Sequence, residues 1–497
     1  MSTGQSSAQA SAPAASGYGL RRELKFWEAI ALSIGIMAPT AAMALNGTAP
    51  AALIGRAVPL AFIFATIGVL LVSYAFVRLS RYFSHAGSVF AFTGVTLGPQ
   101  AGFFSGWALL GTYMAFCCAS TAEAGTFGVA FLNGINVTKS ADYFVIAAIA
   151  GVLIAFLAFG DVRFATRSLL SMEGISVTLI LILMIVIVVK LIGGSAPNGQ
   201  SITINAFKIP GGVSLSAVGS AAVFGFLSFA GFEGAAALGE ETKNPRREIP
   251  RAIRTAVIAS GIFYILCILV QTWGFGADAA GAKAFSTSTA PLGDLAHTYV
   301  GSGMADAINF GATISAFASG LAATVAGARI LYALSRHTPL EGVLGRTTTR
   351  TGAPAGALAV VLVVGIGAIA AQRIAGVSAV NAFFYPGTIG VLSLLVAYIV
   401  TNVGAIRHLF IRARRAPLWE IIFPLLGIAF LVYTLYKNVQ GVAFPYDRFP
   451  LVVGIWLVIG LAIILAVPKL ARTIGKELVR DAGLDESAPE QASQVST

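Results

Sequence analysis

The chain has 497 residues, of which 57% are hydrophobic and only 11% are charged, and its formal net charge is +11. Soluble domains carry about 25% charged residues, so this composition excludes an ordinary soluble protein. Apolar runs of about 20 residues, the length that crosses about 30 Å of hydrocarbon, recur along almost the whole chain. The sequence therefore predicts an all-α integral membrane protein.

Twelve membrane spans are predicted, with polar segments before, between and after them. The N-terminal tail, residues 1–25, has no apolar leader segment, and we expect it to be disordered. Residues 81–98 are too polar to span and predict a short amphipathic element, and the polar loop 336–353 predicts short helices. The charged tail 469–497 is expected to be disordered. The predicted spans are 26–46, 57–77, 100–131, 141–160, 166–193, 215–238, 251–276, 303–335, 354–373, 378–404, 417–437 and 449–468.

The basic excess is distributed asymmetrically between the two sides of the predicted membrane. With twelve spans, 24 of the 32 Lys and Arg residues fall on the side that both termini share. The positive-inside rule then places both termini in the cytoplasm, in the cell (inner) membrane of a bacterial-type cell. The positive charge is thereby explained by topology, and no nucleic-acid partner is expected.

Two predicted spans are interrupted by helix-breaking residues. Pro39 lies inside the first span, and the stretch 225–234 of the sixth span is rich in Gly and small residues. Broken helices persist at membrane depth only where protein or a water-filled cavity surrounds them. Transporters with inverted repeats place their substrate where one broken helix from each half meets the other. The spacing predicts a first repeat over 26–193, a second over 215–404, and two added helices over 417–468.

The residues around the second interruption carry a family resemblance. Gly231-Phe232-Glu233 and the run from Glu240 to Ile253 resemble the signature of amino acid–polyamine–organocation (APC) permeases. Further support comes from His85-Ala86-Gly87-Ser88, Gly98-Pro99, Gly106-Trp107 and residues 328–336. The resemblance covers residues 24–470. It implies a twelve-span permease that moves amino acids by alternating access, through ion-coupled symport or exchange. The alternative within the same fold is a transporter of polyamines or other organic cations.

The resemblance also implies a substrate site at the two interruptions. The family pattern Gly-x-Met-x-Gly-Ser-Gly is replaced here by residues 35–41, in which Pro39 and Ala41 stand where the family has glycines. Backbone N–H groups at such a turn bind the substrate carboxylate at the positive end of a half-helix. We expect these donors at Thr40, Ala41 and Ala42, and carbonyl acceptors for the substrate amine at Met37, Leu227 and Ala230. Ile36 and Phe226 complete the predicted site.

Gating and coupling residues are expected beside this site. Glu233 follows the second interruption and either links substrate binding to gating or caps the following half-helix. Phe226 and Phe229 are candidate occluding aromatics, although such a stripe is also typical of plain packing. Arg329 is expected to pair with Glu240 or Glu241 in an inner gate, or to extend to the membrane interface.

Three further polar residues leave the coupling ion open. Ser319 is a weak sodium-site candidate, since serine in membrane helices usually bonds to a neighbour. Glu123 is interpreted as a boundary carboxylate that reaches water, with attraction of a cationic substrate as the alternative. Glu173 lies in a span where some relatives place a lysine that mimics a coupling cation, so either a proton or sodium remains possible as the coupling ion.

Other classes of function lack the residues they require. The three cysteines lie in predicted spans and are interpreted as apolar filler. No metal-ligand spacing, nucleophile–base pair or phosphate-binding loop is present, so neither an enzyme nor a cofactor is predicted. A channel would need polar rings, and a sensor would need a soluble output domain. The expected partners are a small-molecule substrate, the coupling ion and membrane lipid.

Overall fold

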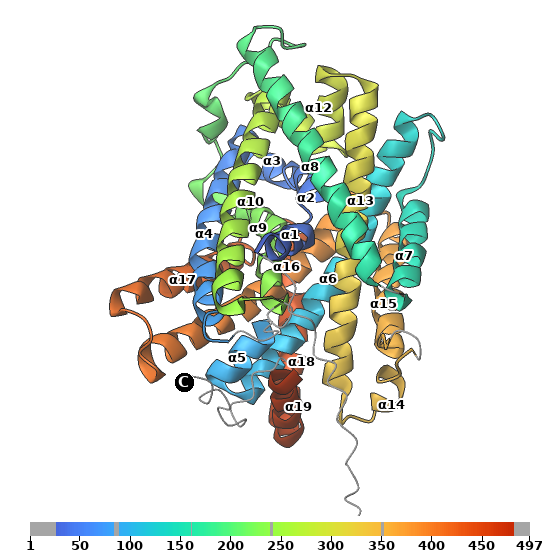
Figure 1. Ribbon diagram of the computed structural model, residues 1–497. Coiled ribbons are helices and arrows are strands. Elements are labelled where there is room, and N and C mark those ends of the chain that lie inside the picture. The colour runs from blue at the N-terminus through green and yellow to red at the C-terminus, as the bar shows by residue number, and fades with distance from the viewer. Residues whose placement is uncertain (1–25, 84–88, 161, 239–241, 349–351, 482–497) are drawn as a thin grey trace, which may run out of the picture.

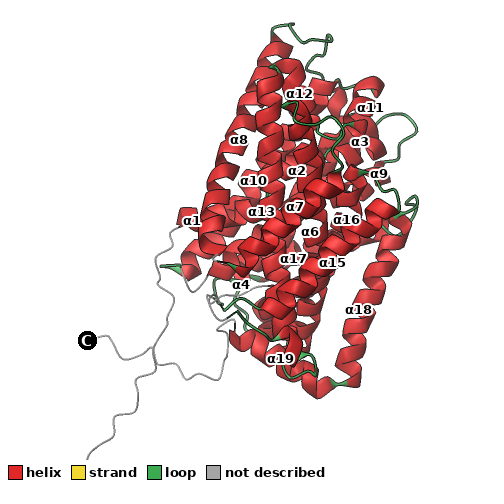
Figure 2. Ribbon diagram, turned by 90° about the vertical axis from the view of Figure 1, so that its right-hand side faces the viewer, coloured by secondary structure: helices red, strands yellow, loops and turns green. Residues whose placement is uncertain are grey.

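The computed structural model describes residues 26–83, 89–160, 162–238, 242–348 and 352–481, and all regular structure in these ranges is helical (Figures 1 and 2). The α-helices are α1 (Phe26–Met37), α2 (Pro39–Leu45), α3 (Thr48–Ile54), α4 (Val58–Leu79), α5 (Val89–Leu97), α6 (Pro99–Gly134), α7 (Tyr143–Phe159), α8 (Val162–Ile192), α9 (Leu215–Phe229), α10 (Pro245–Phe275), α11 (Ala279–Thr287), α12 (Pro291–Tyr299), α13 (Ser302–Ser335), α14 (Glu341–Leu344), α15 (Ala355–Ile374), α16 (Ala379–Ile406), α17 (Ile422–Lys437), α18 (Phe449–Ala466) and α19 (Pro468–Asp481).

Ten helical segments in the described part of the chain are long and apolar enough to cross a membrane. Each of them overlaps one of the spans predicted from sequence. The two remaining predicted spans, 26–46 and 141–160, correspond to shorter apolar helices at Ser33–Leu45 and Tyr143–Phe159. Hydropathy therefore located the helices well, because apolar length is what a bilayer selects.

Two helices form the centre of the bundle. The apolar windows of α6 and of α16 are each 67% buried inside the protein, whereas that of α18 is only 17% buried. α6 packs along both α13 and α16. The outward faces of the peripheral helices carry exposed apolar side chains, among them Phe156, Ile185, Val363 and Leu465. Such a surface is stable against lipid and would be unstable in water, which agrees with the predicted lipid environment.

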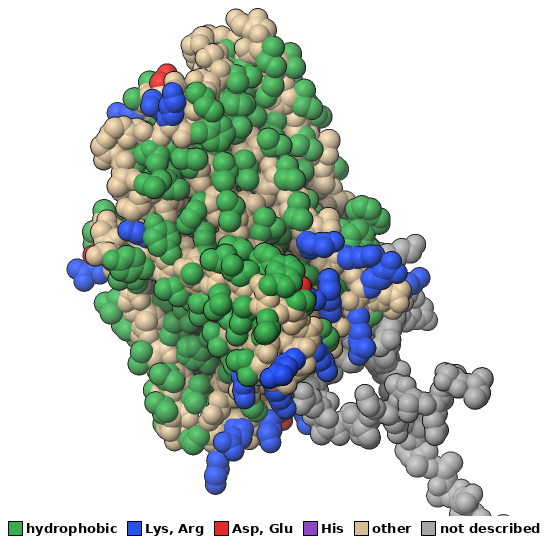
Figure 3. All heavy atoms as spheres, turned by 90° about the vertical axis from the view of Figure 1, so that its left-hand side faces the viewer, with side chains coloured by type: hydrophobic (Ala, Val, Ile, Leu, Met, Phe, Trp, Pro, Cys, Tyr) green, Lys and Arg blue, Asp and Glu red, His purple; other side chains and the backbone are tan. Residues whose placement is uncertain are grey.

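The two kinds of surface residue occupy different parts of the molecule. Figure 3 shows a broad hydrophobic band above a lower end where most Lys and Arg side chains gather. That lower end contains α5, α14 and α19 (Figure 1). The sequence motifs at His85–Ser88 and at Glu240–Glu241 lie outside the described residues.

The predicted disorder of the C-terminal tail is wrong for its first part. Residues 468–481 form α19, which packs against α5 and α6 with Ala471, Ile474 and Leu478 buried. Four basic residues in this stretch raise its polarity, but the apolar ones recur every three or four positions and form one face. The predicted short elements are present in the described residues as α5, which ends at Leu97, and as α14.

Candidate substrate site

The first interruption lies at Ala38, between α1 and α2. Ala38 has φ 46° and ψ 60°, a left-handed conformation that costs a non-glycine residue about 1–2 kcal/mol. Pro39 disfavours helical geometry in the residue before it and lacks an N–H group, so the helix cannot continue through this point. α2 then restarts with Pro39 in its first turn.

The second interruption lies at Ala230 and Gly231, after α9. The chain continues as the short 3-10 segment η3 (Phe232–Leu238). Gly231 has φ +99°, and a Cβ atom there would lie 2.2 Å from Cγ2 of Ile36 on α1. Glycine is therefore required twice, by its backbone conformation and by the close approach of the first broken helix.

Two hydrogen bonds tie the interruptions to each other. The N–H of Ala235 donates to Oγ of Ser33 at 2.9 Å, and Nδ2 of Asn46 donates to Oγ of Ser228 at 2.7 Å. Both bonds are buried, and one joins η3 to α1 whereas the other joins the end of α2 to α9. The broken helices, which lie far apart in sequence, are thus one structural unit.

The backbone donors of the first interruption have partners inside the protein. The N–H of Thr40 donates to Oε1 of Glu173 at 2.9 Å, and the N–H of Ala41 donates to Oγ of Ser315 at 3.1 Å. The N–H of Ala42 donates to the carbonyl of Ala38 at 2.9 Å. A buried carboxylate of α8 therefore occupies the position at the start of α2 where a substrate carboxylate was expected.

A cavity of about 110 Å³ lies between the two interruptions. Its size is comparable with engineered cavities of about 150 Å³ that hold benzene. Of the residues predicted for the site and for gating, Thr40, Phe226, Phe229 and Arg329 are not part of its wall. Those that do line it are Ile36, Met37, Ala41, Ala42, Leu227, Ala230, Glu233 and Ser319. The carbonyl of Leu227 already accepts the Ala230 N–H at 3.3 Å.

Two carboxylates line this cavity. Glu233 is 7% exposed and accepts a hydrogen bond of 2.7 Å from the Tyr398 hydroxyl of α16. Glu123 of α6 is 3% exposed, so its interpretation as a boundary carboxylate in contact with water is wrong. The error has a physical cause: α6 is 36 residues long, and a position late in so long a helix is still at the depth of the cavity. Among the described residues that line the cavity there is no Lys, Arg or His.

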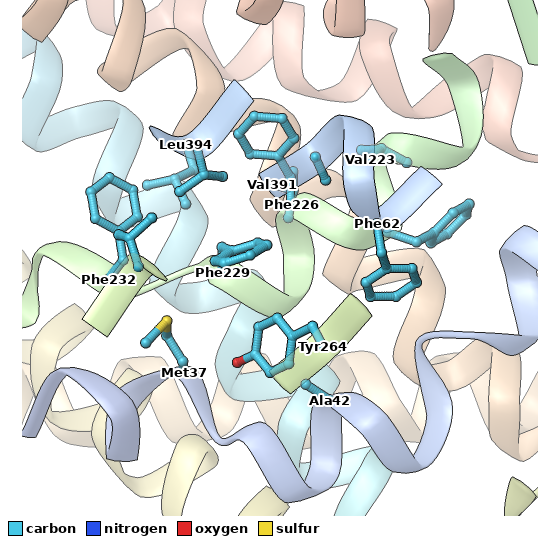
Figure 4. Packing of buried hydrophobic residues seen from close by; sticks show 14 of the residues in the cluster. Met37, Ala42, Phe62, Val223, Phe226, Phe229, Phe232, Tyr264, Val391 and Leu394 are labelled. Atoms are coloured by element: carbon cyan, nitrogen blue, oxygen red, sulfur yellow. The ribbon is translucent and has the colours of Figure 1, made fainter. Parts of the chain in front are cut away.

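The aromatic stripe of the second interruption faces away from the cavity. Phe226 packs on Phe430, Phe229 on Tyr264, and Phe232 on Phe76 and Tyr398. Figure 4 shows these rings among aliphatic side chains of the core. Their role as gates stays a prediction. The rings that do line the cavity are those of Tyr113, Phe116 and Phe383.

The remaining predicted residues have ordinary surroundings. The Ser319 hydroxyl lies 3.0 Å from that of Ser120, which is the neighbour bond usual for serine in membrane helices. Arg329 is exposed, and within the described residues it has no ion pair; its proposed partners Glu240 and Glu241 lie outside them. The three cysteines are free and buried. The described residues hold no group of three or more His, Cys, Asp or Glu suited to a metal ion.

Several lining residues were not assigned to the site from sequence, among them Thr112, Tyr113, Phe116, Asn46 and Phe383. The first three lie on α6, which has no break within it; the motif Gly106-Trp107 on this helix supports the family resemblance and does not mark a site. A useful signal was available: α6 carries Glu123 among small residues, and a polar stripe on a long apolar helix indicates a face turned towards a cavity.

An all-helical bundle of apolar spans with a cavity between two broken helices defines a membrane transporter of the secondary type. The sequence matches the family described as amino acid permease over residues 24–467, and the chain belongs to this family. Similar proteins include the low-affinity putrescine importer PlaP of Escherichia coli K12, which is 26% identical over 93% of this chain and 96% of the importer. The branched-chain amino acid permease BcaP of Bacillus subtilis is 25% identical over 67% of this chain and 71% of that permease. Cationic amino acid transporter 4 of Mus musculus is 30% identical over 54% of this chain and 44% of the mouse protein.

Proposed function

We propose that the protein carries amino acids across the cytoplasmic membrane by alternating access, with ion-coupled symport or exchange as the driving process. The observation that carries the proposal is the cavity formed jointly by the two helix interruptions at Ala38 and at Ala230–Gly231. A pair of broken helices next to a shared cavity is what a solute site between two repeats requires. The twelve-span, five-plus-five plan and the cytoplasmic termini belong to the same proposal. The basic lower end of the molecule supports that orientation.

The occupied donors at Thr40 and Ala41 suggest how coupling works in this proposal. A substrate carboxylate can bind the start of α2 only where the Glu173 carboxylate now binds. Two carboxylates cannot both be ionised at one buried helix start, so the arrival of one favours protonation or withdrawal of the other. Proton symport is the coupling mode that this competition supports.

Counterflow in proteoliposomes tests the function. Liposomes loaded with one unlabelled amino acid should accumulate the same labelled amino acid transiently, and uptake should saturate. A matched preparation without protein is the control. Uptake that never saturates and shows no counterflow would indicate a channel and contradict the proposal.

A second candidate is the transport of polyamines or other organic cations. The acidic lining of the cavity, with Glu123 and Glu233 and without a basic side chain among the described lining residues, favours it. The two candidate functions can be distinguished by their substrates, because an amino acid and its decarboxylated amine differ only in the carboxylate. Counterflow with the amine alone would favour the second candidate.

A further inference from the structure

We propose that Glu123 and Asn46 form an ammonium-binding subsite in the cavity, and that this subsite selects substrates by their positive charge. The inference rests on the proposed transport function and names the chemical group that the cavity recognises. It differs from the expectation that backbone carbonyls alone receive the substrate amine.

Glu123 is a buried carboxylate with an unpartnered oxygen in the described part of the chain. It is 3% exposed, it lines the cavity, and its Oε1 has no hydrogen-bond partner among the described residues. Ser120, three residues before it on α6, is instead bonded to Ser319, and Thr126, three residues after it, donates to the carbonyl of Ala122. An ionised carboxylate in such a place is costly unless a cation or a proton compensates it.

Asn46 supplies a second free acceptor in the same cavity. It is 1% exposed, and its Oδ1 has no partner in the described structure. The orientation of its amide is determined by its neighbour: the Ser228 hydroxyl donates to the carbonyl of Phe224 and therefore accepts from Nδ2 of Asn46. The amide oxygen is thus left as an acceptor without a partner, on a residue that lines the cavity.

The other carboxylates around the cavity are already engaged. Glu233 accepts from Tyr398, and Glu173 accepts from the N–H of Thr40. The free groups at Glu123 and Asn46 are therefore a carboxylate oxygen and an amide oxygen. The described lining also includes the Tyr113 hydroxyl, which can donate or accept, and it includes no basic side chain. A primary ammonium group has one positive charge and three donors, which matches this set. Its bond to a carboxylate is charge-assisted and roughly twice as strong as a neutral hydrogen bond.

The experiment compares ligands that differ at one group on the purified full-length protein. Leucine, its decarboxylated amine and N-acetylleucine are titrated by thermal stabilisation, together with the same three forms of alanine and with putrescine. Leucine keeps both charged groups, the amine keeps only the ammonium, and the N-acetyl form keeps only the carboxylate. We expect stabilisation by ligands that keep the ammonium and none by the N-acetyl forms. Equal binding of N-acetyl and free forms would overturn the proposal without any variant having to fold.

Variants at Glu123 provide the second arm. Glu123→Gln keeps the shape of the side chain and removes its charge, and we expect it to raise the Kd for ammonium ligands at least tenfold. Glu123→Asp keeps the charge and should retain part of the affinity, while the surface substitution Glu341→Gln should leave it unchanged. An unaltered Kd in Glu123→Gln would overturn the proposal, even where proton-driven uptake is lost. If the wild type shows counterflow while the Kd of Glu123→Gln is unchanged, the subsite proposal is wrong but the transport function is retained. Absence of both binding and counterflow in the wild type would remove the transport function as well.

Discussion

At the residue scale, the account depends on a few buried polar groups whose partners come from distant parts of the chain. Thr40 and Glu173 are 133 residues apart in sequence, yet they share a hydrogen bond of 2.9 Å. The sequence marked the break at Pro39 and the donors that follow it, because local backbone chemistry dictates them. It could not show that a carboxylate of α8 occupies those donors, since such pairing is decided by tertiary packing.

Glu173 offers a test of competition at the start of α2. In Glu173→Gln the side chain still accepts from the Thr40 N–H but no longer repels a substrate carboxylate. We expect amino acid binding to lose most of its dependence on pH, measured by titration of thermal stability. Glu341→Gln, which removes the charge of an exposed carboxylate outside the cavity lining, is the matched control and should keep that dependence. If the Kd for the amino acid depends on pH in Glu173→Gln as it does in the wild type, Glu173 and the substrate carboxylate do not compete for the start of α2.

Tyr398 stabilises the carboxylate of Glu233. Removing its hydroxyl in Tyr398→Phe deletes one hydrogen bond to a buried carboxylate, and a bond to a charged group contributes about 1.5–3 kcal/mol. We expect a lower midpoint of thermal unfolding and reduced uptake. Tyr436→Phe, at a half-exposed position, is the control and should unfold as the wild type does. A midpoint unchanged in Tyr398→Phe would show that the bond contributes nothing.

Alanine variants at Gly231 and Gly212 distinguish the effect of backbone strain from that of close packing. Gly231→Ala places a Cβ 2.2 Å from Ile36 at φ +99°, whereas Gly212→Ala has a similar φ of +84° and no atom within 4 Å. The left-handed backbone costs each variant about 1–2 kcal/mol, but only Gly231→Ala must also move α1. We expect counterflow to be lost in Gly231→Ala and retained in Gly212→Ala. Equal activity in the two variants would show that the contact between the interruptions is dispensable.

At the element scale, the sequence predicted the helices that are defined by a long apolar run. It did not predict the helices that are defined by a short apolar face. The long helices coincide with the predicted spans because about 20 apolar residues have few alternatives to crossing a bilayer. α19 was missed because its apolar face contains only a few residues among basic ones. α11 and α12 were likewise not predicted; they lie in a polar connection and are nine residues long each.

The docking of α19 is expected to depend on pH through His337. Nε2 of His337 lies 2.9 Å from Oε1 of Glu477 on α19, and this hydrogen bond raises the pKa of the imidazole above its ordinary value, with a smaller opposing effect from Arg336. A raised folded-state pKa contributes stability that is fully present below the ordinary value of about 6.5 and is lost as pH rises through the raised value. Glu477 also faces Arg336 and Arg480, whose charges persist throughout this range.

Hydrogen exchange of residues 468–481 measures this docking. Protection should be higher at pH 6 than at pH 9 after correction for intrinsic exchange, and His337→Gln should remove the difference. Gly475→Ala, whose Cβ would lie 1.9 Å from the carbonyl oxygen of Pro99, should lower protection at both pH values. Equal protection of the wild type at the two pH values would show that the histidine pair does not hold α19.

At the scale of the whole molecule, charge and hydropathy together indicate how the protein lies in the membrane. The hydrophobic band and the basic lower end predict that α19, with α5 and α14, lies on the cytoplasmic side (Figures 1 and 3). A C-terminal alkaline phosphatase fusion should then be inactive, and a fusion in the loop after α8 should be active. The reverse pattern would invert the proposed orientation.

The central claim is that a solute binds between the two helix interruptions. The most direct test is a cryo-electron microscopy structure of the protein with a ligand that gives counterflow. The account predicts ligand density between Ala38 and Gly231, with the ammonium group of the ligand within hydrogen-bond distance of Glu123. Density at another place, or α1 and α2 joined as one continuous helix, would contradict it.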